Sequence, residues 1–183
     1  MIGWIAKALA TLAAAAGGSL AVAAVGAQPF SLHSTTFAPG SPLPRSTAYD
    51  RGGCGGTNRS PELHWSGAPP GTRSFALVMH DPDAPVAGGW YHWLLYDIPA
   101  SVTRLPEGLV KPPGRSGRNS WGESAYGGPC PPPGPAHRYV FTLYALDVER
   151  LPFTGSPPDG RTLEAALRGH VLGEARLVGL YRR

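Results

Sequence analysis

A short acidic turn is the segment of this chain best suited to chemistry. Asp81-Pro82-Asp83-Ala84-Pro85 follows the apolar run of residues 75–79, and His92 comes seven residues after Pro85. Proline has no N–H to donate to a strand and short acids favour turns, so we expect a stiff corner where a buried strand ends. A second apolar run, residues 90–98, would return His92 to that corner. A rigid acidic turn facing a histidine predicts a binding pocket.

A second histidine, His137, follows a segment rich in glycine and proline, residues 126–135. Two imidazoles and a carboxylate near strand ends can perform three kinds of chemistry. Imidazole N–H groups and backbone amides can bind an oxyanion, while the aspartate accepts a hydrogen bond from a histidine and sets its tautomer. The same groups could instead hold a metal ion, or act as general acid and base.

No motif favours the metal or the catalytic alternative. The chain has no Gly-x-Ser-x-Gly, no phosphate-binding Gly-x-x-x-x-Gly-Lys and no His-Glu-x-x-His. We therefore predict an anion-binding protein with no catalytic residue, no metal ligand and no cofactor. The alternative for His92, which lies between Tyr91 and Trp93, is a core histidine with satisfied hydrogen bonds. The remaining histidines are expected to be structural or exposed: His33, His64, His80 and His170.

The composition favours one folded, turn-rich domain. Charged residues make up 15% of the 183 residues, which argues against disorder, and the 25 glycines and 21 prolines favour turns and short strands. The formal net charge of +4 comes mostly from arginines dispersed along the chain, with no basic block. No nucleic-acid partner is therefore expected.

Periodicity predicts a mainly β protein with one helix. Alternating or continuous apolar runs favour strands over residues 30–37, 63–66, 73–80, 90–98, 138–147 and 174–181. Apolar residues at helical spacing predict a helix over residues 162–170, with Thr162 as its N-cap. The sum indicates a sheet sandwich or an open barrel with long ordered loops.

Residues 1–27 have the form of a secretory signal peptide. Lys7 precedes the uncharged residues 8–24, and Val25-Gly26-Ala27 fits the small-x-small cleavage rule. The mature chain, residues 28–183, is then a single domain in the periplasm or outside the cell. The alternative is a membrane anchor formed by residues 2–27, which are long enough to span a bilayer.

The two cysteines, Cys54 and Cys130, both lie in loop sequences. In an oxidising compartment they are expected to form one disulfide, which would close a loop of about 75 residues. Two separate buried thiols are the alternative.

Six segments in series resemble the phosphatidylethanolamine-binding protein family, also called the Raf kinase inhibitor protein family, in its bacterial branch. In chain order they are Cys54 to Leu63, Asp81 to Pro85, Gly89-Trp90-Tyr91-His92-Trp93, Tyr126 to Pro132, His137-Arg138-Tyr139 and Gly169-His170. One such segment would be a weak match, whereas the series is specific and extends over nearly all of residues 30–183.

The resemblance implies a large antiparallel sheet packed on a smaller one, with one or two helices near the C-terminus. It also implies a small pocket for a phosphate-containing anion, such as a phospholipid head group or a phosphorylated side chain. In that pocket His92 and His137 would donate to the anion and Asp81 would orient a histidine. By position, the ligand-binding residues would be Asp81, Ala84, Pro85, Trp90, His92, Gly128, Pro131, Pro132, His137 and Tyr139.

Family structures further imply a cis peptide bond between Ala84 and Pro85. Animal members tend to have a second histidine where this chain has Tyr91, so one potential donor is absent here. A second hypothesis is an interaction protein that inhibits a kinase or a protease through the pocket rim and residues 111–136. A hydrolase is a third, less favoured one.

Overall fold

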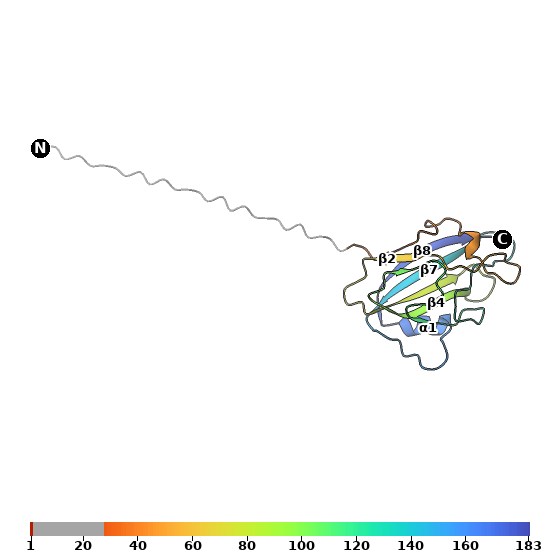
Figure 1. The fold of residues 1–183 in the computed structure, drawn as a ribbon. Helices are drawn as coiled ribbons and strands as arrows, with labels where there is room; N and C mark the ends of the chain where they lie inside the picture. The colour runs from red at the N-terminus through yellow and green to blue at the C-terminus, as the bar shows by residue number, and fades with distance from the viewer. Residues whose placement is uncertain (2–27) are drawn as a thin grey trace.

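Two antiparallel sheets form the framework of the computed structural model, which describes residue 1 and residues 28–183 (Figure 1). The larger sheet has the strand order β6-β4-β3-β7-β8, and the smaller has the order β1-β2-β5. The larger contains β3 (Ser74–Asp81), β4 (Trp90–Pro99), β6 (Arg115–Ser116), β7 (His137–Leu146) and β8 (Val171–Tyr181), and the smaller contains β1 (Ser31–His33), β2 (Leu63–Ser66) and β5 (Arg104–Leu105). The prediction of a large sheet packed on a smaller one is confirmed.

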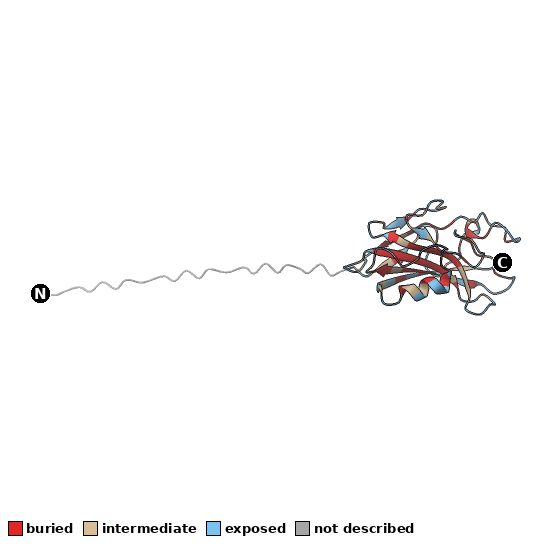
Figure 2. Cartoon of the chain, turned by 90° about the horizontal axis from the view of Figure 1, so that it is seen from below, coloured by how far each residue is buried: buried red, intermediate tan, exposed pale blue. Residues whose placement is uncertain are grey.

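Strand β3 lies at the centre of the large sheet and is buried on both faces. Phe75 and Leu77 share one apolar cluster with Trp65 of the small sheet. Ala76 and Val78 belong to a second cluster, formed with helix α1 (Gly160–Leu167). Because alternate residues of a strand point to opposite faces, β3 contributes to two cores, which explains its continuous apolar sequence. Figure 2 shows these buried strands in the interior, with exposed residues on the outer side of the helix.

Four of the predicted strands match the observed ones within one residue at each end. The first strand is shorter than predicted, because the Ser34 hydroxyl donates to the Glu62 carbonyl and accepts from the Thr36 N–H, which turns the chain out of the ladder. The last strand begins three residues earlier than predicted, at Val171. Strands β5 and β6 and the 3₁₀ helix η1 (Arg45–Thr47) are two or three residues long, too short to produce a periodic signal.

The helix begins and ends earlier than predicted. Its N-cap is Asp159, whose Oδ1 accepts the Thr162 N–H at 2.8 Å, so the prediction of Thr162 as the cap was wrong. A carboxylate placed before the first turn satisfies an amide that has no partner within the helix, whereas Thr162 lies inside it. Leu163 and Leu167, one helical turn apart, are buried against the large sheet.

The signal peptide or anchor predicted for residues 2–27 lies outside the described residues. Among those described, no helix combines the length and the apolar character needed to cross a membrane.

Candidate functional site

One cavity of about 180 Å³ brings together residues from three segments far apart in the chain. Nine of the ten predicted ligand-binding residues line it: Asp81, Ala84, Pro85, Trp90, His92, Pro131, Pro132, His137 and Tyr139. Val86, Trp121 and Cys130 complete the lining. The two imidazoles and the carboxylate of the sequence prediction are therefore neighbours in space.

Asp81, the last residue of β3, holds His137 in one tautomer. Its Oδ2 accepts the His137 Nδ1–H at 2.8 Å, and its Oδ1 accepts the Asp83 N–H at 2.9 Å. Both side chains are nearly enclosed, with 3% of Asp81 and 11% of His137 exposed. Because Nδ1 already donates to the protein, Nε2 is the ring nitrogen that remains for a ligand.

The turn that follows Asp81 contains no cis peptide bond, and none occurs in the described part of the chain, so the prediction for Ala84–Pro85 was wrong. The Val86 N–H donates to the Ala84 carbonyl at 2.7 Å, which makes Pro85 the centre of a three-residue turn. The φ that a proline ring imposes suits the centre of such a turn. Gly88 and Gly89, with φ values of +86° and +74°, then reverse the chain.

A β-bulge in β4 turns His92 toward the cavity. Met79 of β3 pairs with Trp93, and His80 pairs with Tyr91, so His92 is an extra residue between two consecutive pairs. Regular alternation would put His92 on the face opposite Trp93, but the bulge changes the face. The His92 ring instead lies edge-on to the Tyr139 ring, with 5.1 Å between centroids, on the side of the core between the two sheets.

His92 is neutral and offers a lone pair to the cavity. Its Nδ1–H donates to the Gly127 carbonyl at 2.6 Å, while the Gly127 N–H donates to the His92 carbonyl at 2.9 Å. Burial lowers the pKa of His92 to about 4, against the opposing effects of the Gly127 hydrogen bond and the Asp81 charge. At neutral pH Nε2 can therefore only accept a hydrogen bond, which differs from the donor role expected from the sequence.

The donors of the cavity are side chains without protein partners. The Tyr139 hydroxyl and the Trp90 indole N–H are buried and have no hydrogen-bond partner among the described residues. Burial, and then the nearby Asp81 carboxylate, raise the pKa of Tyr139, so its hydroxyl keeps its proton. An unpaired buried donor costs about 1–3 kcal/mol. A ligand that accepted from these groups would remove that cost.

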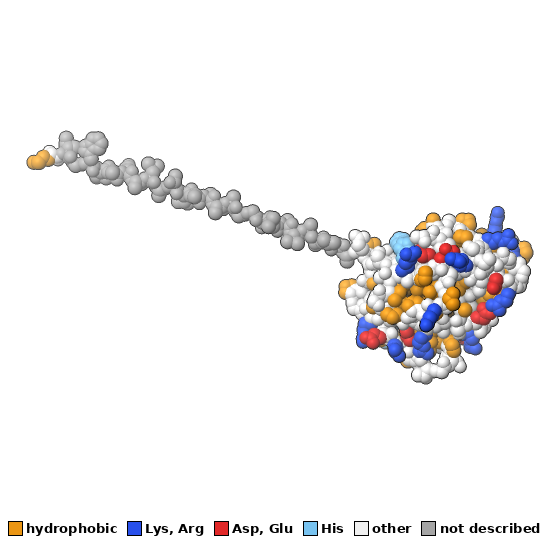
Figure 3. Space-filling view, in the orientation of Figure 1, with side chains coloured by type: hydrophobic (Ala, Val, Ile, Leu, Met, Phe, Trp, Pro, Cys, Tyr) orange, Lys and Arg blue, Asp and Glu red, His pale blue; other side chains and the backbone are white. Residues whose placement is uncertain are grey.

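Arg138, the cation next to His137 in sequence, pairs with Asp83 instead of lining the cavity. Its guanidinium makes two hydrogen bonds to the Asp83 carboxylate, at 2.9 and 2.7 Å, and its backbone N–H makes a third at 2.9 Å. This pairing holds the pKa of Asp83 at about 2, well below its usual value. More widely, basic and acidic side chains are interspersed on the face shown in Figure 3.

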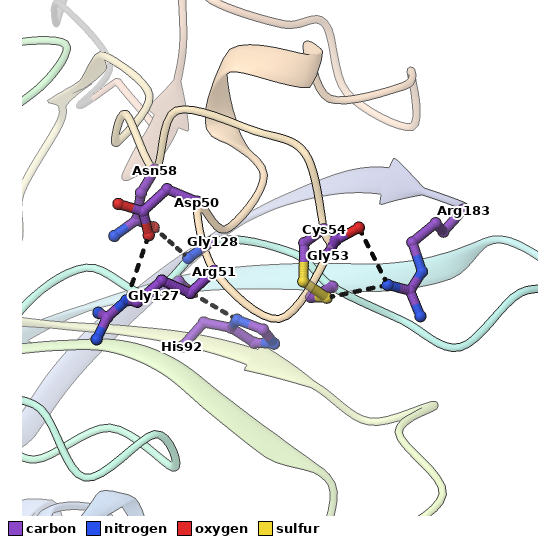
Figure 4. Close-up of a disulfide and its surroundings, with 10 residues drawn as sticks. Asp50, Arg51, Gly53, Cys54, Asn58, His92, Gly127, Gly128 and Arg183 are labelled. Carbon is purple, nitrogen blue, oxygen red and sulfur yellow. Dashed lines mark hydrogen bonds and ion pairs between the residues drawn. A yellow bond between two sulfur atoms is a disulfide. The ribbon is translucent and has the colours of Figure 1, made fainter.

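A disulfide between Cys54 and Cys130 joins one wall of the cavity to the loop between η1 and β2, which contains Cys54. The two Cα atoms are 5.3 Å apart (Figure 4). Cys130 itself lines the cavity beside Pro131 and Pro132. Of the two alternatives that the sequence left open, the structure therefore has the disulfide.

Gly128 is the predicted site residue that does not line the cavity. Its N–H donates to Asn58 Oδ1 at 2.7 Å (Figure 4). A Cβ at this position would lie 2.0 Å from the Thr47 carbonyl oxygen. Glycine therefore permits the close approach of two backbone segments, and Gly128 positions the wall instead of contacting the cavity.

Trp121 and Val86 are the lining residues that the sequence prediction missed. The Trp121 ring stacks on Tyr49, with centroids 4.3 Å apart, and meets the edge of Trp90 at 5.0 Å. Its only sequence signal is an isolated large aromatic in a segment of small polar residues. For the metal alternative, the described residues contain no group of three or more histidine, cysteine or acidic side chains placed to hold an ion.

This fold and this cavity define a class of small β proteins with two antiparallel sheets and a cavity at the ends of strands β3, β4 and β7. The chain belongs to the phosphatidylethanolamine-binding protein family, whose model matches residues 33–182. As the name of the family states, it is a family of ligand-binding proteins. The prediction of the family from six short segments is confirmed.

Relatives and solved structures agree with this assignment. The UPF0098 protein YbcL of Escherichia coli is 39% identical over 160 residues, which cover 83% of this chain and 87% of YbcL. The crystal structure of YbcL, described as a new member of the mammalian family, superposes with a TM-score of 0.79 and 36% identity, covering 84% of this chain and 98% of YbcL. A Mycobacterium tuberculosis protein named as a lipoprotein, LppC, is 38% identical over 158 residues, or 85% of this chain and 73% of LppC.

Proposed function

We propose that this protein binds a small phosphate-containing anion, such as a phospholipid head group or a phosphorylated group, in the cavity lined by Asp81, His92 and His137. The main support is the convergence of two buried imidazoles with two unpaired donors in about 180 Å³. Pockets for drug-sized ligands usually measure about 300–1,000 Å³, so the cavity suits a small polar group.

The hydrogen-bonding pattern favours a phosphate that carries one proton. The neutral His92 Nε2 can accept from a P–OH group, while Tyr139 and Trp90 can donate to the unprotonated oxygens. A phosphate monoester, with a second pKa of about 6, supplies this proton at mildly acidic to neutral pH, whereas the diester of an intact phospholipid carries no such proton and is expected to bind more weakly. Sulfate has a similar shape but no proton, so we expect it to bind more weakly than phosphate.

Isothermal titration calorimetry with O-phosphoethanolamine tests the proposal. Replacing His137 by alanine should weaken binding by about 10- to 100-fold, because a hydrogen bond to a charged group contributes about 1.5–3 kcal/mol. The matched control is His170→Ala, since His170 also bonds to an aspartate, Asp147, but lies outside the cavity. Circular dichroism should show that both variants fold. Undiminished binding by folded His137→Ala would refute the assignment.

We also propose that residues 28–183 act as a single exported domain in the periplasm or outside the cell. The disulfide and the lipoprotein-named relative both support export. Sequencing the N-terminus of the protein purified from its own cells should give a start near Gln28. An intact N-terminus in the membrane fraction would favour the anchor of residues 2–27 instead.

A further inference from the structure

We infer that the cavity is one half of a two-part site, whose second half is an arginine-lined groove that takes a second acidic group of the same ligand. The groove measures about 450 Å³ and adjoins the cavity at Val86 and Trp90, which line both. This inference rests on the proposed phosphate binding and names the class of phosphate: one that also carries a carboxylate or a further phosphate.

Positive charge distinguishes the groove from the cavity. Arg118 and Arg161 line it, and Asp159 is the one acidic side chain in its lining. The Asp159 carboxylate is used as the helix cap, and its hydrogen bonds to Thr162 lower its pKa, so it stays ionised. Two arginines against one aspartate leave one positive charge without a compensating group in the lining.

The groove is held by the same segments that shape the cavity. The loop of residues 118–122 places Arg118 in the groove and Trp121 in the cavity. The buried Asn119 side chain fixes this loop, because its Oδ1 accepts the N–H groups of Trp121 and Glu123, each at 3.0 Å. A fixed loop common to both halves means that an anion in one half constrains where its other end can lie.

The rim between the two halves is tied down by the second arginine. Arg161 donates to the Ala87 carbonyl at 2.8 Å. A Cβ at Gly88 would lie 2.3 Å from Arg161 Nη2, so the guanidinium packs closely against the rim. Since only some of its donors are used there, Arg161 can still donate to an anion.

The remaining groove lining combines apolar and polar side chains. Tyr91 has its side chain on this side of β4, and its hydroxyl donates to Glu164 at 2.8 Å. Asn119 and Ser120 complete the polar lining. The expected occupant is thus a compact doubly acidic ester. Such an ester could be a free metabolite or a lipid head group that contains a carboxylate.

Titration calorimetry with pairs of simple esters tests the two-part site. Each pair consists of an ω-carboxyalkyl phosphate and the ω-hydroxyalkyl phosphate of the same chain length. The wild-type protein should prefer the carboxylate by about 2- to 5-fold per arginine, the range of exposed ion pairs. Arg118→Gln should reduce this preference, and the double variant Arg118→Gln/Arg161→Gln should abolish it. Arg150→Gln, an arginine in a different surface hollow, should leave it unchanged.

The outcomes separate the two proposals. If both esters of every pair bind the wild-type protein equally, the second half of the site is refuted and phosphate binding stands. If neither ester binds, the proposed function fails and the two-part site fails with it.

Vesicles of phosphatidylcholine that contain either phosphatidylserine or phosphatidylethanolamine show whether the ligand is a lipid or a soluble molecule. If the wild-type protein binds the phosphatidylserine vesicles more tightly and the double variant does not, the ligand is a lipid. If the preference for a carboxylate is seen only with the free esters, the ligand is a soluble molecule.

Discussion

Two histidine–aspartate pairs of nearly equal length lie in different surroundings. The His137 Nδ1 to Asp81 Oδ2 distance is 2.8 Å, and the His170 Nδ1 to Asp147 Oδ1 distance is 2.9 Å. The side chains of the first pair are 11% and 3% exposed, whereas those of the second are 40% and 46% exposed. Water and salt screen the exposed pair, but hardly affect the buried one.

The partners around each pair explain the difference in role. Asp147 also donates its N–H to the His170 carbonyl at 3.0 Å, so this pair clamps the end of β7 to the segment that follows α1. Asp81 instead joins His137 to the turn after β3, and both line the cavity. The same chemical pair is a surface clamp in one place and part of a candidate site in the other, and burial decides which.

The largest expected effect comes from removing the disulfide beside the buried pair. In Cys54→Ser/Cys130→Ser, the loss of a cross-link that spans 76 positions should lower the free energy of unfolding by about 4 kcal/mol. Urea denaturation measures this loss. The ring NMR signals of His137 should shift, and those of His170 should not. A shift of both sets would show that the disulfide holds the whole sheet and not the cavity wall.

The next effect concerns the neutral histidine of the cavity. The pKa of His92 is about 4 in the folded protein and about 6.5 when exposed. Between these values the unfolded state binds the extra proton, so stability is full above pH 6.5 and declines as the pH falls to 4, by on the order of 3 kcal/mol. Urea denaturation across this range should show a smaller decline in His92→Gln. An equal decline in both proteins would contradict the buried neutral ring.

Matched amide substitutions compare the two aspartates directly. Asp81→Asn replaces one accepting oxygen by an N–H₂ group in a buried position, and should cost about 1–3 kcal/mol of stability. The same change at Asp147 should cost less than about 0.5 kcal/mol, as is usual at exposed positions. Thermal unfolding of both variants measures the difference. Equal costs would mean that burial does not separate the pairs.

The smallest effect is expected at the ion pair next to the cavity. Since Arg138 lowers the pKa of Asp83 to about 2 from 3.8, the pair stabilises the fold above pH 4, and this contribution is lost as the pH falls toward 2. Because 58% of the Arg138 side chain and 31% of the Asp83 side chain are exposed, Arg138→Gln should cost less stability than Asp81→Asn. In acid titrations the variant should lose less stability below pH 4 than the wild type. A larger cost would make Arg138 part of the buried region.

The motif-bearing part of the site could be predicted, and the supporting part could not. Asp81, His92 and His137 belong to short, unusual segments, so their residue types identified them. Trp121 reaches the cavity from a loop with no periodic signal, and its role depends on contacts with Tyr49 and Trp90. The prediction of a cis peptide bond before Pro85 was wrong. The three-residue turn centred on Pro85 depends on the hydrogen bond from Val86 to Ala84, which the sequence pattern does not reveal.

The amino-acid sequence by itself determined the β-rich fold and the corner after β3, because alternation and proline rings act on local chain geometry. Tertiary structure alone decided the face and the protonation of His92. The bulge exists because β4 has one residue more than its partner β3 in that stretch of pairing. The low pKa exists because the surrounding sheets exclude water from the ring. Neither pairing register nor burial is a property of the residues next to His92, and both arise only when distant segments pack together.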